Sequence, residues 1–242
     1  RDTPDATAGC FVVGDVGVLR RAVGYATGAG QVALPVAQIT SPAEVATLPP
    51  RCIPVLQIHE HAAPVLRMGQ VSGVAGRLAG DCVVWAARAA LRGDIAALVT
   101  APLHKEALAA AGAPYDAYPG HTELLQAEAT AYLGRPVAQV PVRMMLANNE
   151  LRTVLVSIHM SLRQAIDAVT FDNVLQTLRI THAALSRTLG QSPRIGVAGL
   201  NPHAGEGGLF GSEELETIIP AITAAQAEGL DVHGPFAPDT VF

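Results

Sequence analysis

Cysteine, aromatic residues and positive charge are all scarce in this chain of 242 residues. The three cysteines, Cys10, Cys52 and Cys82, are odd in number and widely spaced, which argues against a disulfide scaffold and a cysteine-rich zinc site. We therefore expect a reducing, cytoplasmic environment. The formal net charge is −5 and there is no basic run, so a surface that follows nucleic-acid phosphates is not expected.

Long apolar runs are also missing. None reaches the ~18 residues that would indicate a membrane span, and no signal peptide is visible. We therefore expect neither a membrane nor a nucleic acid as a partner. Half of the residues are nonetheless hydrophobic and only 15% are charged, so the chain can bury a large core in one large or two small domains.

Apolar β-branched runs alternate with segments of helical periodicity along the chain. This alternation predicts an α/β fold with a mostly parallel sheet. A domain boundary is expected near residues 100–150, although composition does not mark it. The expected strands or extended runs are 10–15, 31–39, 49–58, 95–100, 142–146, 151–158, 194–200 and a last one from 231. The runs 142–146 and 151–158 could pair across the turn at Asn148–Asn149. The expected helices are 16–27, 73–92, 105–112, 123–133, 161–189 as one or two helices, and 212–228.

The most informative segment is the glycine-rich loop at residues 199–208, which follows an expected strand. It carries Asn201, His203 and Glu206. Ligands of open α/β sheets bind beyond the carboxyl ends of strands, glycine lets backbone approach a ligand closely, and histidine is the commonest metal ligand. The loop therefore predicts a binding site. The alternative is a glycine-rich turn with a surface histidine.

Two other strand ends repeat this plan. His159 directly follows an expected strand, and the strand at 95–100 is followed by His104 and Lys105 after Thr100. One histidine at a strand end is more often structural than a ligand. Three such ends in one chain indicate a common polar cleft.

A fourth candidate lies in the Tyr-Pro-Gly-His-Thr-Glu segment at residues 118–123. The Pro-Gly pair forces a turn, and His121 and Thr122 lie where a helix is expected to begin. These two side chains could bind an anion or a hydroxyl at the helix N-terminus. An ordinary N-cap is the alternative.

Several other polar residues favour structural roles. Glu213 and Glu214 follow Ser212, an expected N-cap, and acidic residues in a first turn usually suit the helix dipole. His59 and His61, in a proline-rich region, are interpreted as solvated loop residues. The glycines at 205–211 lack the spacing and the later acidic residue of a dinucleotide-binding loop.

Six motifs then stand in the order of a known family. Taken together, they resemble the 4-hydroxythreonine-4-phosphate dehydrogenase family of vitamin B6 biosynthesis, from about residue 70 to the end. The motifs are TAPLHK at 100–105, YPGHTE at 118–123, MMLA at 144–147 with Leu-Arg at 151–152, His159 with Leu-Arg at 162–163, GLNPHAGEGG at 199–208 and GPFAPDTVF at 234–242.

The resemblance implies a fold like that of the isocitrate and isopropylmalate dehydrogenases, with two α/β domains and a cleft between them. It also implies a homodimer whose active site is completed across the interface. The family's opening glycine-rich motif and its last segments are not in the sequence, so residues 1–242 are expected to be an incomplete two-domain enzyme cut at both ends.

The resemblance also assigns residues. It implies a divalent metal held by three histidines, of which His159 and His203 match two, while the third belongs to a His-Asp-Gln-Gly motif expected beyond Phe242. His121 and Thr122 match a substrate-binding pair, with His121 also catalytic. Asp239 matches a catalytic acidic residue near the reacting centre. NAD or NADP is implied, but no residues that bind it are identified.

The implied reaction is oxidation of a secondary alcohol by hydride transfer to nicotinamide, followed by decarboxylation, with the metal stabilising negative charge on oxygen. Zinc, cobalt, manganese or magnesium could serve. The implied substrate is 4-hydroxythreonine 4-phosphate. Threonate or erythronate 4-phosphate is the alternative, a ring dihydrodiol is less compatible with the His121–Thr122 pair, and a non-catalytic binding protein is a further class.

Overall fold

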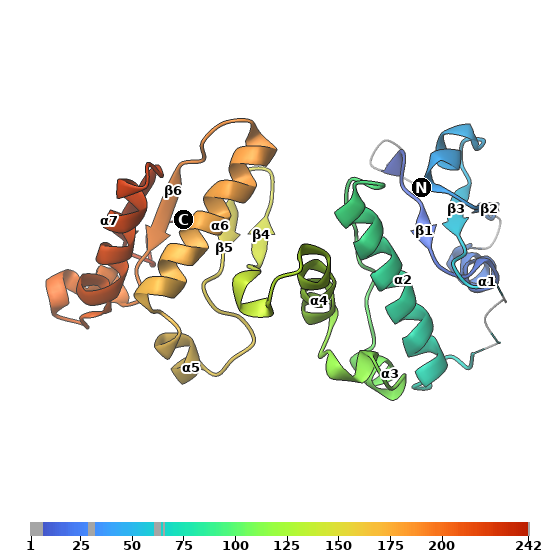
Figure 1. The fold of residues 1–242 in the computed structure, drawn as a ribbon, viewed down its shortest axis with the longest axis horizontal. Helices are drawn as coiled ribbons and strands as arrows, with labels where there is room; N and C mark the ends of the chain where they lie inside the picture. Colours follow the sequence, from blue (N-terminus) through green and yellow to red (C-terminus); the bar gives the residue numbers. More distant parts are fainter. Residues whose placement is uncertain (1–6, 29–31, 61–63, 65, 242) are drawn as a thin grey trace. The chain divides into compact units, whose positions relative to one another are not determined.

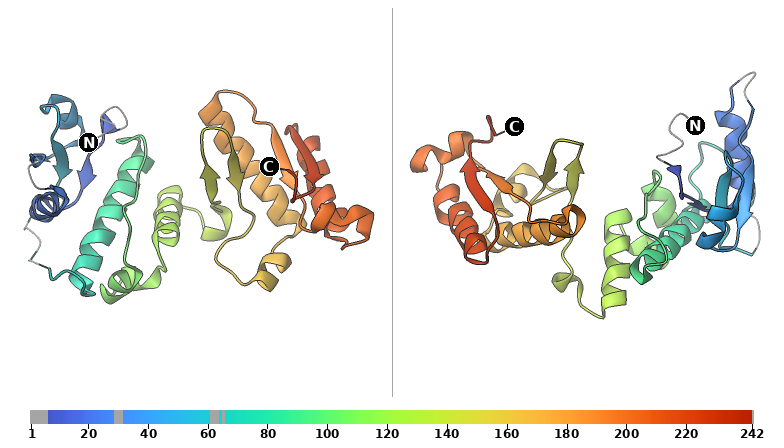
Figure 2. Two further views of the ribbon diagram at one scale, coloured as in Figure 1. Left: turned by 180° about the vertical axis from the view of Figure 1, so that it is seen from behind. Right: turned by 90° about the horizontal axis from the view of Figure 1, so that it is seen from above.

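The computed structural model describes residues 7–28, 32–60, 64 and 66–241. The expectations that touch residues 1–6, Gln31, His61 and Phe242 lie outside the described residues. The chain divides into two compact units, residues 1–141 and 142–242, each containing both helices and strands. The two units are described separately below (Figures 1 and 2).

The first unit begins with a small parallel sheet. Its strands β1 (Val12–Val13), β2 (Val36–Ile39) and β3 (Ile53–Leu56) are ordered β1-β3-β2. Ile39 and Val55 are almost completely buried, as expected for strands of a parallel sheet covered by other elements. Helix α1 (Val16–Ala26) starts at Asp15, whose carboxylate accepts a hydrogen bond from the Val18 amide.

Helix α2 (Gly73–Arg92) is the longest element of the first unit and has the bounds that its periodicity predicts. Ser72 caps its start, and Gly93 ends it in the left-handed conformation, with φ of 82°. It packs against α3 (Lys105–Ala110) and α4 (His121–Leu133), as Figures 1 and 2 show.

Glycine allows α2 and α3 to approach closely. A Cβ atom on Gly76 would overlap the carbonyl group of Ala107, so no other residue fits there without displacing backbone. Beside this contact lies a core formed by Leu108, Tyr115 and Leu124. The short turns of this unit are η2 (Pro42–Thr47), η3 (Tyr115–Ala117) and η4 (Val137–Gln139).

The strand expected at residues 95–100 is not formed. The segment makes no ladder with any other described residue, and the Val99 side chain is 92% exposed. The sequence prediction was wrong here because β propensity supplies only a suitable side-chain pattern, whereas a strand also needs a partner strand.

The second unit contains two separate two-stranded sheets. Strands β4 (Met145–Ala147) and β5 (Arg152–Val154) form the antiparallel hairpin predicted across the Asn148–Asn149 turn. Strands β6 (Ile195–Ala198) and β7 (Val232–Phe236) are parallel. The single, mostly parallel sheet expected from the sequence is therefore replaced in the described residues by three small sheets, two of them parallel.

Helices α6 (Phe171–Leu189) and α7 (Ile219–Ala227) lie beside β6 and β7 (Figure 2). Their buried faces contribute Leu178 and Ile222 to the core of this unit. The helical region predicted at 161–189 is two helices, because α5 (Leu162–Asp167) ends before Thr170 caps α6.

Arg143 fastens the chain leading into β4 to helix α6. Its guanidinium donates hydrogen bonds to the side chains of Asn173, Gln176 and Thr177. Burial lowers the pKa of this guanidinium from its ordinary value, although arginine stays charged throughout the physiological range. The charge is therefore held by neutral oxygen acceptors that stabilise one conformation.

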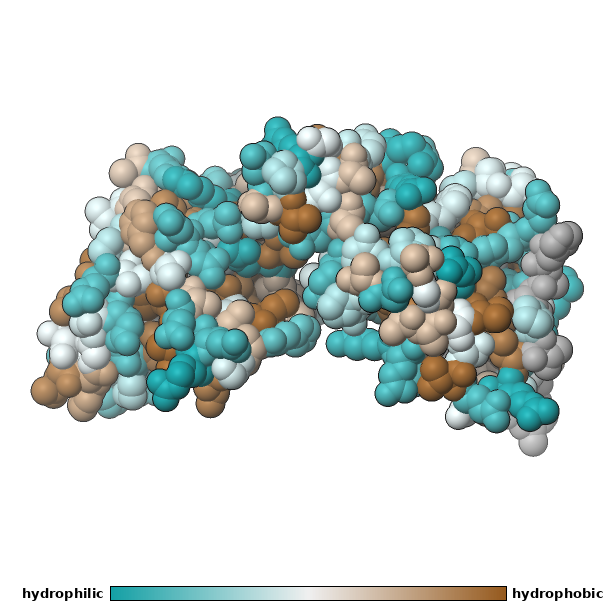
Figure 3. All heavy atoms as spheres, turned by 60° about the horizontal axis from the view of Figure 1, so that its bottom comes forward, coloured by the Kyte–Doolittle hydropathy of each residue, from teal (hydrophilic) through white to brown (hydrophobic). Residues whose placement is uncertain are grey.

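The surface carries apolar side chains among hydrophilic ones on each unit, as Figure 3 shows for one face. The most exposed large ones include Val99 and Leu162. Within the described part of the chain, no helix combines the length and apolarity needed to cross a bilayer.

Candidate functional site

The glycine-rich loop after β6 has an uncommon backbone conformation. Within η5 (Pro202–Gly208), the residues from His203 to Gly208 all have positive φ. Three of them, His203, Ala204 and Glu206, are not glycine, and the left-handed conformation costs such residues roughly 1–2 kcal/mol each. Strain of this kind persists only where surrounding contacts fix the backbone, and it gathers at functional sites.

The left-handed turn presents His203 to Asp239. His203 Nδ1 lies 3.2 Å from Asp239 Oδ2, and both side chains are about half exposed. Strands β6 and β7 are parallel neighbours, so the segments that follow them leave the sheet at the same end. Two residues identified separately from the sequence therefore form one polar site that solvent can reach.

Glu214 lies underneath this loop. Its carboxylate accepts hydrogen bonds from the amides of Leu200 and Asn201, each at 2.7 Å, and from Asn201 Nδ2 at 2.9 Å. The residue is only 2% exposed. Burial alone would raise the pKa of Glu214, but the hydrogen bonds from Asn201 and Leu200 hold it below its ordinary value. The carboxylate is therefore charged at neutral pH.

The prediction that Glu214 acts in helix capping was wrong. The segment η6 (Glu214–Ile218) is a short π-helix that continues into α7. The side chain of Glu214 points back to the loop and accepts the Leu200 amide there. The neighbouring Glu213 accepts a hydrogen bond from Asn201 Nδ2, which lowers its pKa. The helix begins at Glu213, and the Ser212 carbonyl accepts a hydrogen bond from the Glu216 amide at 2.8 Å, as expected of an N-cap residue.

The glycines at positions 205 and 211 are the sequence signal for the carboxylates beneath the loop. A Cβ atom on Gly205 would lie 2.7 Å from Glu214 Oε2, and one on Gly211 would lie 2.5 Å from Glu213 Oε2. Both glycines also have positive φ. They leave the space that the two carboxylates occupy, but only the folded structure shows which side chains fill it.

His159 lies beyond β5 and is exposed. The strand ends at Val154 rather than at residue 158, so His159 follows it after an irregular segment. Its φ of 54° resembles the 55° of His203. Both candidate metal ligands thus have left-handed backbones. No group of three or more His, Cys, Asp or Glu suited to a metal occurs in the described ranges.

His121 and Thr122 open α4 and are partly buried. The N-cap is Gly120, which has no side chain, so neither residue has the ordinary capping role that the sequence left open. A Cβ on Gly120 would lie 3.6 Å from Lys105 Cε. The first unit therefore brings the TAPLHK and YPGHTE motifs together.

His104 has a structural role. It is the N-cap of α3, and its Nδ1 accepts a hydrogen bond from the Ala107 amide at 3.3 Å. Of the polar residues expected at this strand end, Lys105 is therefore the one placed beside the His121 turn, while Thr100 is exposed on the irregular segment.

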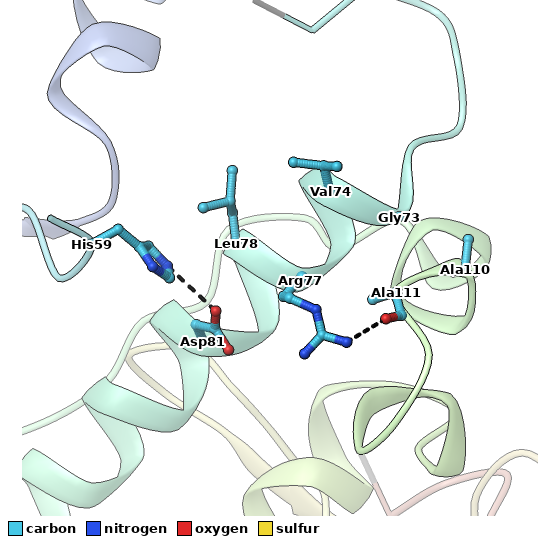
Figure 4. Close-up of a pocket in the computed structure, with 8 residues that line it drawn as sticks. All are labelled: His59, Gly73, Val74, Arg77, Leu78, Asp81, Ala110 and Ala111. Carbon is cyan, nitrogen blue, oxygen red and sulfur yellow. Dashed lines mark hydrogen bonds and ion pairs between the residues drawn. The ribbon is translucent and has the colours of Figure 1, made fainter. Parts of the chain in front are cut away.

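His59 lies in a loop, as the sequence predicts, and its side chain is 33% exposed, but its Nε2 atom is buried rather than solvated. Figure 4 shows it pointing toward Asp81 in the wall of a cavity of about 510 Å³. His59 Nε2 lies 3.4 Å from Asp81 Oδ2, an ion-pair distance without hydrogen-bond geometry. Asp81 Oδ1 in turn accepts a hydrogen bond from the Tyr115 phenol. The cavity is lined by His59, Gly73, Val74, Arg77, Leu78, Asp81, Ala110 and Ala111.

Comparison with known families places these motifs in context. The family described as pyridoxal phosphate biosynthetic protein PdxA matches residues 6–242. A 4-hydroxythreonine-4-phosphate dehydrogenase of Beijerinckia indica is 53% identical over 72% of this chain and 49% of its own length. A D-threonate 4-phosphate dehydrogenase of Salmonella typhimurium is 48% identical over 73% of this chain and 51% of its own.

Solved structures show the same relationship. The crystal structure of 4-hydroxythreonine-4-phosphate dehydrogenase from Klebsiella pneumoniae has a TM-score of 0.82 and 38% identity, covering 96% of this chain and 66% of that one. The chain thus spans about half the length of the two curated relatives and about two thirds of the Klebsiella structure.

Proposed function

The chain belongs to the family of the pyridoxal phosphate biosynthetic protein PdxA, and from this membership we propose that it supplies the active-site residues of a dehydrogenase. The proposed reaction is the NAD- or NADP-dependent oxidation, with decarboxylation, of 4-hydroxythreonine 4-phosphate in pyridoxal phosphate biosynthesis. The Beijerinckia and Klebsiella relatives carry the name of this activity. A bound nicotinamide would accept the hydride.

The observation that carries the proposal is the His203–Asp239 pair. A half-exposed carboxylate beside an imidazole suits a site that takes the proton of a substrate hydroxyl. Asp239 is the proposed catalytic residue at the reacting carbon. His203 Nδ1 faces this carboxylate, which leaves Nε2 for a ligand on the outer side of the ring.

We further propose a divalent metal, namely zinc, cobalt, manganese or magnesium, with His159 and His203 as two of its ligands. Two exposed imidazoles on left-handed backbones fit such an ion in donor type. The described residues form no group of three or more His, Cys, Asp or Glu that could hold a metal ion. When bound, the ion would supply a Lewis acid for the substrate oxygens.

His121 and Thr122 are proposed to bind the phosphorylated substrate, with His121 also catalytic. Their place in the first turn of a 13-residue helix favours contact with negative charge, since free backbone amides point outward there. Partial burial lets them hold one orientation. Lys105, on the neighbouring motif, adds positive charge close to this turn.

The alternative substrate is another phosphorylated acid, such as D-threonate or erythronate 4-phosphate. The Salmonella relative named D-threonate 4-phosphate dehydrogenase favours it, at 48% identity. Both substrates present a phosphate and a neighbouring hydroxyl, so the described residues serve either one.

The proposal extends to assembly. We propose an architecture like that of the isocitrate dehydrogenases, and a cytoplasmic homodimer. The exposed apolar side chains favour association, because patches of several hundred Å² usually mark contact surfaces. An obligate dimer would bury more than about 2,000 Å². Light scattering should then give twice the chain mass at micromolar concentration, whereas a stable, active monomer would contradict the assembly.

The activity is tested by following nicotinamide reduction with NAD⁺ or NADP⁺ and a panel of substrates. The panel holds 4-hydroxythreonine 4-phosphate, threonate and erythronate 4-phosphates, and a ring dihydrodiol. Asp239→Asn should abolish turnover of the preferred substrate. Asp231→Asn is the matched control, because Asp231 pairs with His233 at 2.6 Å in the same unit. Equal loss in both variants, or no turnover of any phosphorylated acid, would overturn the proposal.

A further inference from the structure

We propose that Glu214 is a positioning residue whose buried carboxylate fixes the left-handed loop at residues 199–208 and thereby holds His203 beside Asp239. The functional meaning of this role rests on the proposed role of His203. The positioning itself is a structural statement that can be tested without turnover.

The contacts of Glu214 lie where the loop leaves its strand. Oε1 accepts hydrogen bonds from the amides of Leu200 and Asn201. These two amides follow Gly199, whose own amide still donates to the Phe236 carbonyl at the end of β7. Oε2 accepts Asn201 Nδ2. Three charge-assisted hydrogen bonds therefore fix the direction in which the backbone enters the turn.

The turn needs this support because its own conformation is unfavourable. His203, Ala204 and Glu206 have φ between 43° and 55°, the left-handed region that costs residues other than glycine. The Ala204 amide donates to the Asn201 carbonyl at 3.1 Å, so the turn is anchored on the residue that Glu214 holds. Releasing Asn201 would let these residues relax toward ordinary φ values and carry His203 away from Asp239.

Glu214 also fills the space beneath the turn. Its carboxylate would be 2.7 Å from a Cβ on Gly205 and 3.1 Å from one on Gly199. The two glycines thus close over the carboxylate on both sides, and truncating it would leave a cavity lined by unsatisfied amides. An ordinary capping or solvated glutamate makes no such contacts.

The two acceptor oxygens of the Glu214 carboxylate should contribute to positioning, in addition to the volume that the side chain fills. Glutamine could keep one oxygen for the Leu200 and Asn201 amides, but its NH₂ group would face Asn201 Nδ2. Turning the Asn201 amide would restore that contact and break its bond to Glu213. Glu214→Gln should therefore retain part of the function, and Glu214→Ala very little.

The test compares four variants well below their melting temperatures. Glu214→Ala and Glu214→Gln remove the contacts, while Glu216→Gln removes a charge from an exposed position of the same π-helix. Ile222→Val, in the core of the same unit, is a control for destabilisation alone. The readouts are the NMR signals of the Leu200 and Asn201 amides and the His203 ring, and the affinity for Co²⁺ alone from its visible absorption.

Glu214→Ala should show several or broadened signals for the His203 ring and a Co²⁺ affinity lower by about ten- to a hundred-fold. Glu214→Gln should lie between it and the wild type, and both controls should match the wild type. If Glu214→Ala keeps a single His203 environment, like Ile222→Val, positioning is overturned and Glu214 is only stabilising. If the wild type binds no Co²⁺, the proposed metal site fails, while the NMR signals still decide the positioning role.

Discussion

The phenol of Tyr115 donates a hydrogen bond to Oδ1 of Asp81, 34 residues earlier in the chain. The same carboxylate faces His59 through Oδ2. Asp81 lies on helix α2, whereas His59 precedes this helix in the chain and Tyr115 follows it. One carboxylate therefore joins three parts of the first unit and fixes a wall of its cavity.

Tyr115→Phe should lower the free energy of unfolding of the first unit by about 1–2 kcal/mol, because it removes a hydrogen bond to a charged group that water can only partly replace. Tyr115 is 4% exposed, so the ring itself stays packed. The single tryptophan, Trp85, lies on α2 and reports on this unit during urea unfolding. Tyr25→Phe, at a position 73% exposed, should change little.

Gly76→Ala should destabilise the first unit by about 2–3 kcal/mol, because the added Cβ meets backbone of α3 that no rotamer change can move aside. The same substitution at Gly24, within α1, should have the opposite sign. No atom lies within 4 Å of a Cβ there, and alanine is favoured over glycine within a helix by about 0.5–1 kcal/mol. Equal effects at both positions, measured by urea unfolding, would contradict the close helix contact.

The raised pKa of the Cys82 thiol predicts that the folded protein loses stability at alkaline pH. Burial, and then the charges of Asp81 and Asp15, raise its pKa from 9.0 to about 11. Because folding raises this pKa, keeping the thiol neutral adds to the free energy of unfolding. That contribution is complete below pH 9 and is lost as the pH rises toward 11. The stability followed by Trp85 fluorescence should therefore fall over this range, and Cys82→Ala should flatten the profile.

The same shift predicts low reactivity of this thiol. Only the thiolate is nucleophilic, so Cys82 should be alkylated by iodoacetamide at mildly alkaline pH far more slowly than the exposed Cys10. Mass spectrometry of the labelled peptides measures both rates in one sample. Similar rates at the two positions would show that Cys82 is not held in a partly buried, negatively charged setting.

The sequence predicted elements that depend on local signals. The bounds of α2 followed from helical spacing, because periodicity is a local property, and the structure shows the caps Ser72 and Gly93 at its two ends. The β4–β5 hairpin followed in the same way from two apolar runs around an Asn-Asn turn. The strand at residues 95–100 failed because pairing is not a local property.

The candidate site residues show the same difference between local and non-local signals. His203 was identified in the loop after an expected strand and Asp239 through the family resemblance, and the structure brings the two side chains together. Glu214 and His59 were missed, because each acquires its role from a partner distant in the chain. A glutamate in a first turn and a histidine in a proline-rich loop look the same in the sequence whether they are solvated or enclosed.

His121→Ala should lower turnover of the phosphorylated substrate by about a hundred-fold or more, the usual effect of losing a positioned acid–base group. The bound metal should remain, because the proposed ligands His159 and His203 lie on other segments. His233→Ala, at an exposed side chain paired with Asp231, is the control and should leave turnover unchanged. Metal content by atomic emission and turnover by nicotinamide reduction are measured on the same preparation. Loss of metal together with activity in His121→Ala would assign His121 to the metal site instead of the substrate.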